Sequence, residues 1–187
     1  MALRCSGEQP YGAAQVQSKN KAFLMSIKLL ITGGTIDKVY NQSNGELTFD
    51  ETHFPDMLLR ARTEVEIGSE TLLLKDSLDM VDADRELILK HCLECDEDWI
   101  LITHGTDTMC ETARLLGESS LNKTIVLFGA MVPYAVNNSD ALFNFGCALG
   151  SVQLLEAGVY VAMNGRVLPW GDVQKNRDLG VFQPLSP

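Results

Sequence analysis

The stretch that decides the fold is LLITGGTIDKVYNQ, residues 29–42, in which an apolar run stops at two glycines followed by a threonine. The apolar residues 27–31 are typical of a buried parallel strand. Gly33 and Gly34 then allow backbone angles that other residues resist, and they let a ligand approach the main chain closely. We therefore expect a strand that ends in a tight turn displaying Thr35. A turn that merely connects two elements is the alternative, and the rest of the chain has to decide between them.

Strands and helices are expected to alternate along the rest of the chain. This alternation predicts an α/β fold with an open, mostly parallel sheet covered by helices on both faces, in three layers and one domain from residue 25 to 187. The further strands are predicted at residues 63–74, 99–102, 123–131, 159–162 and, at an edge, 165–168; the helices are predicted at residues 55–61, from Asp82 or Asp84 to about 95, from 107 onward, and at 140–155.

Three segments are expected to lie outside this sheet. Residues 38–50 carry the turn signal NQSNG between two short apolar runs, which predicts a β-hairpin or mobile flap. The tail, residues 169–187, is expected to be a loop. Residues 1–24 are polar, have no helical or strand period and do not resemble a secretory signal, so we expect a disordered extension. Met25 directly precedes the first strand and is a candidate start of translation.

Composition narrows the class of protein. A chain of 187 residues with 45% hydrophobic content can bury one full core. Fifteen basic and 25 acidic residues give a formal charge of −10, which argues against nucleic acid or an anionic membrane as partner, because phosphate contacts require clustered Lys and Arg. No apolar stretch approaches the length of a membrane span. The five cysteines have no small-scaffold spacing and suit reduced thiols, so a cytoplasmic location is expected.

Cys92 and Cys95 form a C-x-x-C beside His91, and a zinc site is conceivable there. A structural zinc requires four ligands, however, and the sequence offers no second pair at a suitable spacing. Two thiols one helical turn apart on a partly buried face are the simpler interpretation. We therefore expect no metal, and nothing in the sequence requires an organic cofactor.

Four segments that follow predicted strands carry polar or glycine residues suited to a site. Because ligands of open parallel sheets bind beyond the carboxyl ends of the strands, these segments should share one rim of the sheet. They are residues 32–35, residues 103–108, residues 129–131, and Asp76 with Ser77. Binding of a nucleotide is disfavoured, because neither G-x-G-x-x-G nor G-x-x-x-x-G-K-[ST] occurs.

Hydrolysis of an amide by a hydroxyl nucleophile is the alternative chemistry for this rim. A threonine hydroxyl is a poor nucleophile until something removes its proton. Thr106 and Asp107 lie where a helix is expected to begin, so free N–H groups and the positive end of the helix dipole favour developing negative charge. Asp107 could equally be an ordinary acidic residue at a helix start.

Five motifs resemble those of the bacterial-type L-asparaginases, the asparaginase/glutaminase amidohydrolases. They are ITGGTID, ITHGTDTMCETA, GAMVP, NNSDALFN and MNGRVLPWGDVQK. They occur in the family's order from Ile27 to about Lys175, and T-G-G-T-I and H-G-T-D-T-M are specific to the family at this spacing. The resemblance implies the family's N-terminal domain, with a flavodoxin-like fold.

The resemblance also implies catalytic roles. Thr35 corresponds to the nucleophile, while Thr106, Asp107 and Lys175 correspond to a group in which lysine and aspartate polarise a threonine hydroxyl or its bound water. Whether Thr35 or Thr106 attacks first is left open. Tyr40 is a candidate for the flap tyrosine that orients Thr35.

Further residues are implied in substrate binding. Ser77 corresponds to the residue that holds the substrate α-carboxylate. The Thr106 backbone N–H is a candidate oxyanion donor, and each such donor lowers the activation barrier by ~3 kcal/mol. The Ala130 carbonyl is placed to accept from the leaving amide nitrogen. Gly34, Asp76 and Asp107 complete the expected binding set.

The sequence departs from the family at two points. By the resemblance, family members have a smaller C-terminal domain, from which a neighbouring subunit supplies an acidic residue to the substrate α-amine. We expect that domain to be absent here. The residue after Ser77 is usually a polar partner of that amine, whereas here it is Leu78. A buried, unpaired ammonium is costly, so the hypothesis is a different small amide as substrate, or a partner that completes the pocket.

Two rivals to a threonine amidohydrolase remain at this stage. One is a non-catalytic module that binds an amino acid or dicarboxylate on the same fold, and the other is a flavodoxin-like nucleotide or phosphate binder that rests on the fold alone. His104 is expected to pack a turn rather than act as a base, and His53 and His91 are expected at the surface. The resemblance implies a homo-oligomer, most simply a two-fold dimer.

Overall fold

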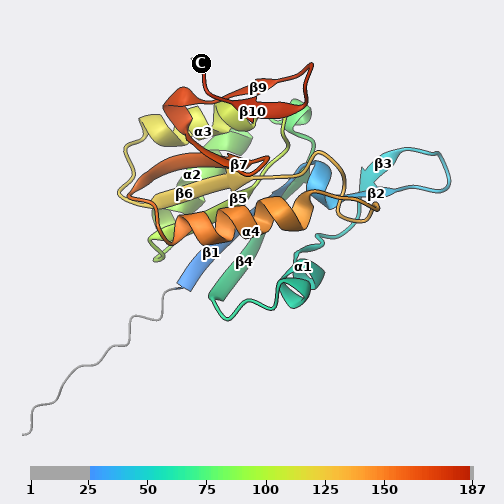
Figure 1. Ribbon diagram of the computed structural model, residues 1–187, viewed down its shortest axis with the longest axis horizontal. Helices are drawn as coiled ribbons and strands as arrows, with labels where there is room; N and C mark the ends of the chain where they lie inside the picture. Colours follow the sequence, from blue (N-terminus) through green and yellow to red (C-terminus); the bar gives the residue numbers. More distant parts are fainter. Residues whose placement is uncertain (1–25, 186–187) are drawn as a thin grey trace, which may run out of the picture.

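The computed structural model describes residues 26–185, so the extension predicted over residues 1–24 and the candidate start at Met25 lie outside the described residues. A six-stranded sheet forms its centre (Figure 1). In spatial order the strands are β4 (Glu66–Lys75), β1 (Ser26–Gly33), β5 (Trp99–Thr103), β6 (Thr124–Phe128), β7 (Gly158–Met163) and β8 (Arg166–Pro169).

The order of these strands confirms the predicted open, mostly parallel sheet. The first five are parallel to their neighbours, and β8 returns antiparallel to β7 at the edge, as expected. Taken in chain order, the parallel strands occupy the spatial positions 2-1-3-4-5, which is the flavodoxin-like arrangement. In that arrangement the connections reverse direction between β1 and β5. Ligands of such sheets bind at this reversal, so the exits of β1 and β5 are where a site is expected.

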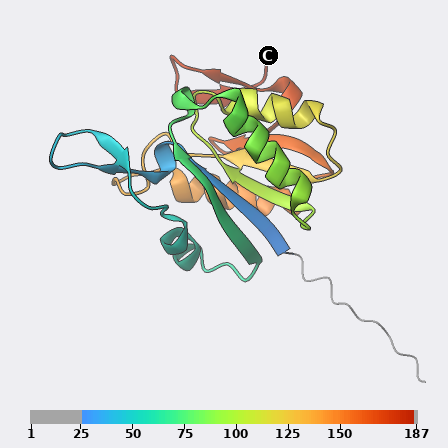
Figure 2. The ribbon, with the colours of Figure 1, turned by 180° about the vertical axis from the view of Figure 1, so that it is seen from behind.

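Helices cover both faces of the sheet, which gives the predicted three layers. The helix α4 (Ala141–Val152) lies in front of the sheet in Figure 1, and α1 (Phe54–Ala61) packs against α4. The helices α2 (Asp82–Glu94) and α3 (Met109–Glu118) lie on the opposite face, which Figure 2 turns toward the reader. Each face has its own cluster of buried apolar side chains, so the sheet is buried on both sides.

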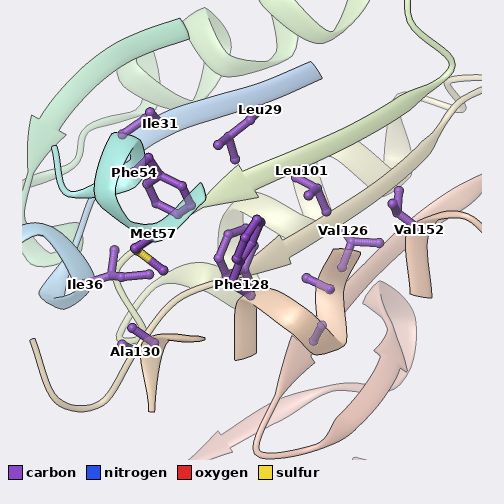
Figure 3. Packing of buried hydrophobic residues seen from close by; sticks show 14 of the residues in the cluster. Leu29, Ile31, Ile36, Phe54, Met57, Leu101, Val126, Phe128, Ala130 and Val152 are labelled. Carbon is purple, nitrogen blue, oxygen red and sulfur yellow. The ribbon is translucent and has the colours of Figure 1, made fainter. Parts of the chain in front are cut away.

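Three phenylalanines form the centre of the cluster beneath α1 and α4 (Figure 3). Phe54 meets Phe128 and Phe145 edge-on, with ring centroids 5.9 and 5.7 Å apart, and Phe128 and Phe145 are tilted at 5.7 Å. Such pairs add about 1 kcal/mol each beyond the burial of their area. The apolar pattern that predicted a buried sheet is therefore met by dense aromatic packing against its front face.

The tail is not a loop, contrary to the prediction. A short 3-10 turn η3 (Trp170–Asp172) leads into an antiparallel hairpin of β9 (Gln174–Asn176) and β10 (Val181–Gln183). Phe182 and Val173 anchor the hairpin, because both side chains are buried in the cluster beneath α2 and α3. Burial of these two side chains supplies free energy that the polar sequence QKN of β9 could not supply by itself.

The predicted flap is confirmed as a hairpin that projects from the sheet (Figure 1). After a 3-10 turn η1 (Thr35–Asp37), β2 (Lys38–Tyr40) pairs antiparallel with β3 (Leu47–Phe49). Because few apolar side chains of the flap are buried, its position depends on polar contacts at its base.

Several element boundaries differ from the prediction. The strand β4 begins three residues later than expected, and α4 ends three residues earlier. The helix α3 begins at Met109, so Asp107 lies in the turn before the helix. The Thr108 hydroxyl donates to the Ser77 carbonyl at 2.8 Å, a contact that holds this turn against the end of β4.

The two cysteines of the C-x-x-C do not share one helix face, because α2 ends at Glu94 and Cys95 is extended. Cys92 is buried on α2, and Cys95 follows the helix half-buried. Within residues 26–185, no group of three or more His, Cys, Asp or Glu side chains is placed to hold a metal ion. Among the described helices, none combines the length and apolarity that crossing a bilayer requires.

Candidate active site

The glycines after β1 are required by a close approach of two main chains. Gly33 and Gly34 have φ of +85° and +83°, a region that side-chain-bearing residues rarely adopt. A Cβ on Gly34 would overlap the backbone of His104 and Gly105. The loops that follow β1 and β5 therefore touch directly, and Thr35 and Thr106 each follow one of the touching glycines.

A pair of threonines fastens the ends of the same two strands together. The Thr32 hydroxyl donates to the Thr103 carbonyl at 2.5 Å, and the Thr32 N–H donates to the Thr103 hydroxyl at 3.0 Å. Both side chains are fully buried. These bonds fix the floor of the site, because buried hydrogen-bonded groups are costly to separate.

The end of β4 joins this floor through Ser77. A Cβ on Gly105 would lie 2.5 Å from the Ser77 hydroxyl, so the two residues are already in contact. The Ser77 hydroxyl is buried and has no hydrogen-bond partner in the structure. Since unpartnered buried hydroxyls are rare, this one is available to a ligand such as a carboxylate.

Lys175 brings the distant end of the chain to Thr106 and Asp107. Its ammonium donates to the Thr106 hydroxyl at 2.7 Å and to Asp107 Oδ1 at 3.0 Å. The Lys175 side chain is only 12% exposed, and the Asp107 side chain is 30% exposed. Because the ammonium occupies an acceptor position on the Thr106 oxygen, the hydroxyl proton stays free to be donated elsewhere. The three side chains thus form one connected hydrogen-bonded group at the exit of β5.

The hairpin explains why Lys175 reaches this position. In the β9–β10 ladder Lys175 pairs with Phe182, whose side chain is buried beneath α3. Residues that pair directly across an antiparallel ladder place their side chains on the same face of the sheet. The burial of Phe182 therefore fixes the register that aims Lys175 at the rim, a dependence that the loop prediction for the tail could not anticipate.

Asp76 caps the turn η2 (Ser77–Asp79) that carries Ser77. Its Oδ1 accepts from the Leu78 N–H at 2.9 Å, and its Oδ2 forms an ion pair with Lys38 of the flap. Desolvation opposes ionisation here, but the hydrogen bonds from Lys38 and Leu78 outweigh it, so the pKa of Asp76 is lowered overall. Sequence analysis missed Lys38, which ties the base of the flap to the rim.

Asp37 was also missed, and it fixes the turn that begins with Thr35. It is fully buried and accepts from the Thr52 hydroxyl at 2.9 Å and from the His53 N–H at 3.0 Å. Burial raises the pKa of this carboxyl, although the two hydrogen bonds partly offset the effect. Asp37 therefore connects the displayed Thr35 to the chain that follows the flap.

Tyr40 and Thr35 are placed differently with respect to the floor. Thr35 is half-buried at the start of η1, beside the contact between Gly34 and Gly105. Tyr40 is 62% exposed on β2, and its phenolic oxygen lies over Gly45 in the flap's own turn. Orientation of Thr35 by Tyr40 stays a prediction, and it requires the flap to move.

The loop after β6 supplies the remaining wall. Ala130 is buried there, and Asp140 holds the loop by accepting from the N–H groups of Met131 at 2.9 Å and Val132 at 3.0 Å. Asn144 donates to the Gly129 carbonyl at 3.0 Å. The motif NNSDALFN thus acts as a clamp on GAMVP, a role that the pattern alone did not reveal.

His104 packs the floor and is not arranged as a base. Its Nδ1 lies 2.8 Å from the Gly105 carbonyl and its Nε2 lies 2.7 Å from the Thr112 hydroxyl. A carbonyl only accepts, so Nδ1 carries the proton and Nε2 accepts from Thr112. Burial lowers the pKa of His104 to about 4, which keeps the ring neutral in the physiological range.

A separate cavity lies between α1 and the loop after β6. Its lining includes His53, Asp56, Arg60 and Tyr134, and none of the predicted site residues contributes to it. His53 was expected at the surface, but its Nε2 is buried and has no hydrogen-bond partner. His91, by contrast, is partly exposed and lies 3.1 Å from Glu70.

A family model described as "Asparaginase, N-terminal" matches residues 26–181, nearly all of the described chain. The chain belongs to the asparaginase family. The resemblance that the five motifs predicted is therefore confirmed, and the matched residues correspond to the N-terminal domain of the family.

Individual members of the asparaginase family show the same extent of similarity. A protein of Haemophilus influenzae described as a probable periplasmic L-asparaginase is 34% identical over 186 residues, which cover 92% of this chain and 52% of that protein. The structure of the thermostable L-asparaginase from Thermococcus kodakarensis superposes with a TM-score of 0.77 at 30% identity, covering 87% of this chain and 52% of that one. A probable cytoplasmic L-asparaginase from Campylobacter jejuni gives a TM-score of 0.72 at 30% identity, covering 86% and 53%.

The chain thus spans about half the length of these asparaginase relatives. These relatives include one described as periplasmic and one described as cytoplasmic, so the family does not fix a compartment for this chain.

Proposed function

We propose that this chain is an asparaginase-type amidohydrolase that hydrolyses a side-chain or small-molecule amide to a carboxylate and ammonia. The observation that carries the proposal is the contact of Lys175 with both Thr106 and Asp107, at 2.7 and 3.0 Å. An ammonium, a carboxylate and a hydroxyl in one partly buried group are suited to moving a proton at a reacting centre.

In the proposed reaction, the Thr35 oxygen attacks the amide carbon and its proton passes to the group of Thr106, Asp107 and Lys175. Within this group the Asp107 carboxylate receives the proton, and the Lys175 ammonium stabilises the negative charge that develops during the attack. The proton then goes to the leaving nitrogen, the carbon–nitrogen bond breaks and ammonia departs, which leaves an ester on Thr35. Water hydrolyses the ester to the carboxylate and restores the hydroxyl.

Binding of the substrate uses the floor of the site. The unpartnered Ser77 hydroxyl donates to a substrate carboxylate. The Thr106 N–H stabilises the oxyanion, and the Ala130 carbonyl accepts from the leaving nitrogen. Gly34 and Asp76 line the same site. Neither metal nor organic cofactor enters any of these steps.

The assembly that we propose follows from the family resemblance, and the location follows from cysteines that suit reduced thiols. A homodimer in the cytoplasm is the simplest arrangement for the chain. The rival function is a module that binds an amino acid or dicarboxylate on the same fold without turning it over.

Release of ammonia separates the two functions. Wild-type chain is incubated with a panel of small amides, namely asparagine, glutamine and succinamate, and ammonia is measured by a coupled assay. Thr35→Ala should lower turnover about a thousandfold or more, because the nucleophile is lost, and Lys175→Met should lower it about a hundredfold or more. Thr71→Ala, which removes an exposed hydroxyl on β4, is the matched control and should leave turnover unchanged.

The contrary result is equally sharp. If wild type binds aspartate or succinate by calorimetry but releases no ammonia from any amide in the panel, the chain is a binding module and the hydrolase proposal is wrong.

A further inference from the structure

Asp107 forms ion pairs with two cationic side chains rather than one. Besides the Lys175 ammonium at 3.0 Å, the Arg177 guanidinium lies 3.3 Å from the same Oδ1 atom. Arg177 also donates to the Asp107 carbonyl at 3.4 Å. One carboxylate between two cations leaves this cluster with a net charge of +1.

The two cations face different surroundings. The Lys175 side chain is 12% exposed, whereas the Arg177 side chain is 64% exposed just beyond the end of β9. The turn that carries Arg177 is held by Asn176, whose Oδ1 accepts from the Leu179 N–H at 3.1 Å. Arg177 therefore presents positive charge on the solvent-exposed side of Asp107.

The opposite wall presents an apolar side chain and an acid that is already paired. The hydrogen bond from Thr108 to the Ser77 carbonyl places the turn η2 beside the Asp107 loop. Leu78 on this turn is 64% exposed, and Asp76 beside it is already paired with Lys38. A substrate ammonium at this position would thus meet one apolar side chain, two carboxylates already paired with cations, and a guanidinium of like charge.

From these contacts, and resting on the proposed amidohydrolase function, we infer that Arg177 is a specificity-determining residue. It selects short carboxylic acids that carry a terminal amide and no free α-ammonium, and it disfavours free amino acids such as asparagine. Like charges a few ångströms apart repel, and solvent around an exposed guanidinium weakens the repulsion. We therefore expect kcat/KM at low ionic strength to be about three- to tenfold higher for the amide without an ammonium. This difference should become smaller as salt is added.

The test compares asparagine with succinamate, which differs only in lacking the α-ammonium. We expect wild type to have the higher kcat/KM for succinamate. Arg177→Gln should raise the asparagine-to-succinamate ratio of kcat/KM about three- to tenfold, and Arg177→Lys, which keeps the charge, should restore the wild-type ratio. Arg166→Gln, which removes an exposed arginine on β8, is the control and should leave the ratio unchanged.

A binding measurement keeps the inference separate from catalysis. Calorimetry of aspartate and succinate should show the same preference for the ligand without an ammonium, and Arg177→Gln should reduce it. If wild type prefers asparagine and aspartate, or if Arg177→Gln leaves both ratios unchanged, the inference is wrong while amide hydrolysis still stands. If the binding preference follows Arg177 but no amide is hydrolysed, the inference stands and the hydrolase proposal fails.

Discussion

The Lys175 ammonium reaches a hydroxyl that precedes it by 69 residues in the chain, and this contact shows how the site is made. No local pattern announces the lysine, because a polar residue in a polar tail has the composition of a solvated loop. Its place in the motif GDVQK, by resemblance, was the only signal for it. Lys38 and Arg177 lie in none of the five motifs, and Asp37 ends the motif ITGGTID without any assigned role, since the partners of all three are known only once the chain has folded.

Asp37 offers a test of burial at the scale of one residue. A carboxyl whose pKa is raised by folding binds its proton more tightly in the folded state. Its ionisation therefore costs folding stability as the pH rises from about 3.8, the unperturbed value, through the raised folded pKa. We expect Asp37→Asn, which keeps an oxygen acceptor without the charge, to be more stable than wild type at pH 7 by about 1 kcal/mol.

Urea unfolding at pH 7 and at pH 3.5 measures this effect. The advantage of the asparagine variant should shrink at pH 3.5, where Asp37 itself becomes protonated. Asp50→Asn, which changes an exposed acid of the flap, should leave the free energy of unfolding unchanged at both pH values. An Asp37→Asn protein that is less stable than wild type at pH 7 would show that its hydrogen bonds fully compensate the buried charge.

At the scale of elements, apolar periodicity predicted the long strands and helices but not the last hairpin. Residues 29–31 and 100–102 are apolar and buried, so their pattern is read easily. The strand β9 has three residues, QKN, and no apolar period. Only Val173 and Phe182 beside the polar segment hinted at an anchored hairpin, and two isolated apolar residues are also common in loops.

Phe182 links the stability of this hairpin to the proposed chemistry. Phe182→Ala should remove the anchor of β10 and let Lys175 leave Thr106, so we expect kcat to fall at least tenfold, together with a loss of about 3 kcal/mol of unfolding free energy. Leu185→Ala, in which the side chain is half-exposed just after β10, is the control and should alter both quantities little.

Ammonia release and chemical unfolding are measured on both variants. Retention of full turnover by a folded Phe182→Ala protein would mean that Lys175 is held in place by something other than the hairpin register.

At the scale of the whole molecule, the alternation of strands and helices was enough to predict the layers. The spatial order of the strands then follows the flavodoxin-like arrangement that the family resemblance implied, and it brings the exits of β1 and β5 side by side. Exact boundaries were less predictable, because hydrogen bonds such as that of Thr108 to Ser77 decide where a helix begins.

The aromatic cluster under α4 should carry much of the stability of the whole molecule. Phe145→Ala is expected to lower the free energy of unfolding by about 3–5 kcal/mol, because it leaves a cavity between Phe54 and Phe128. The matched control is Phe143→Ala, two positions away on the same helix, where the side chain is 62% exposed and the loss should stay near 0.5 kcal/mol. Guanidinium unfolding compares the two, and equal losses would contradict the assignment of the core.

The contact of Gly34 with Gly105 has a practical consequence for anyone who redesigns this protein. Where one backbone lies directly against another, a side chain has no space, so the floor of the site does not tolerate substitution. Leu78 and Arg177 have most of their side-chain surface in water and can be exchanged at little cost to folding. Libraries aimed at new amides should therefore vary those two positions and leave every glycine beneath them alone.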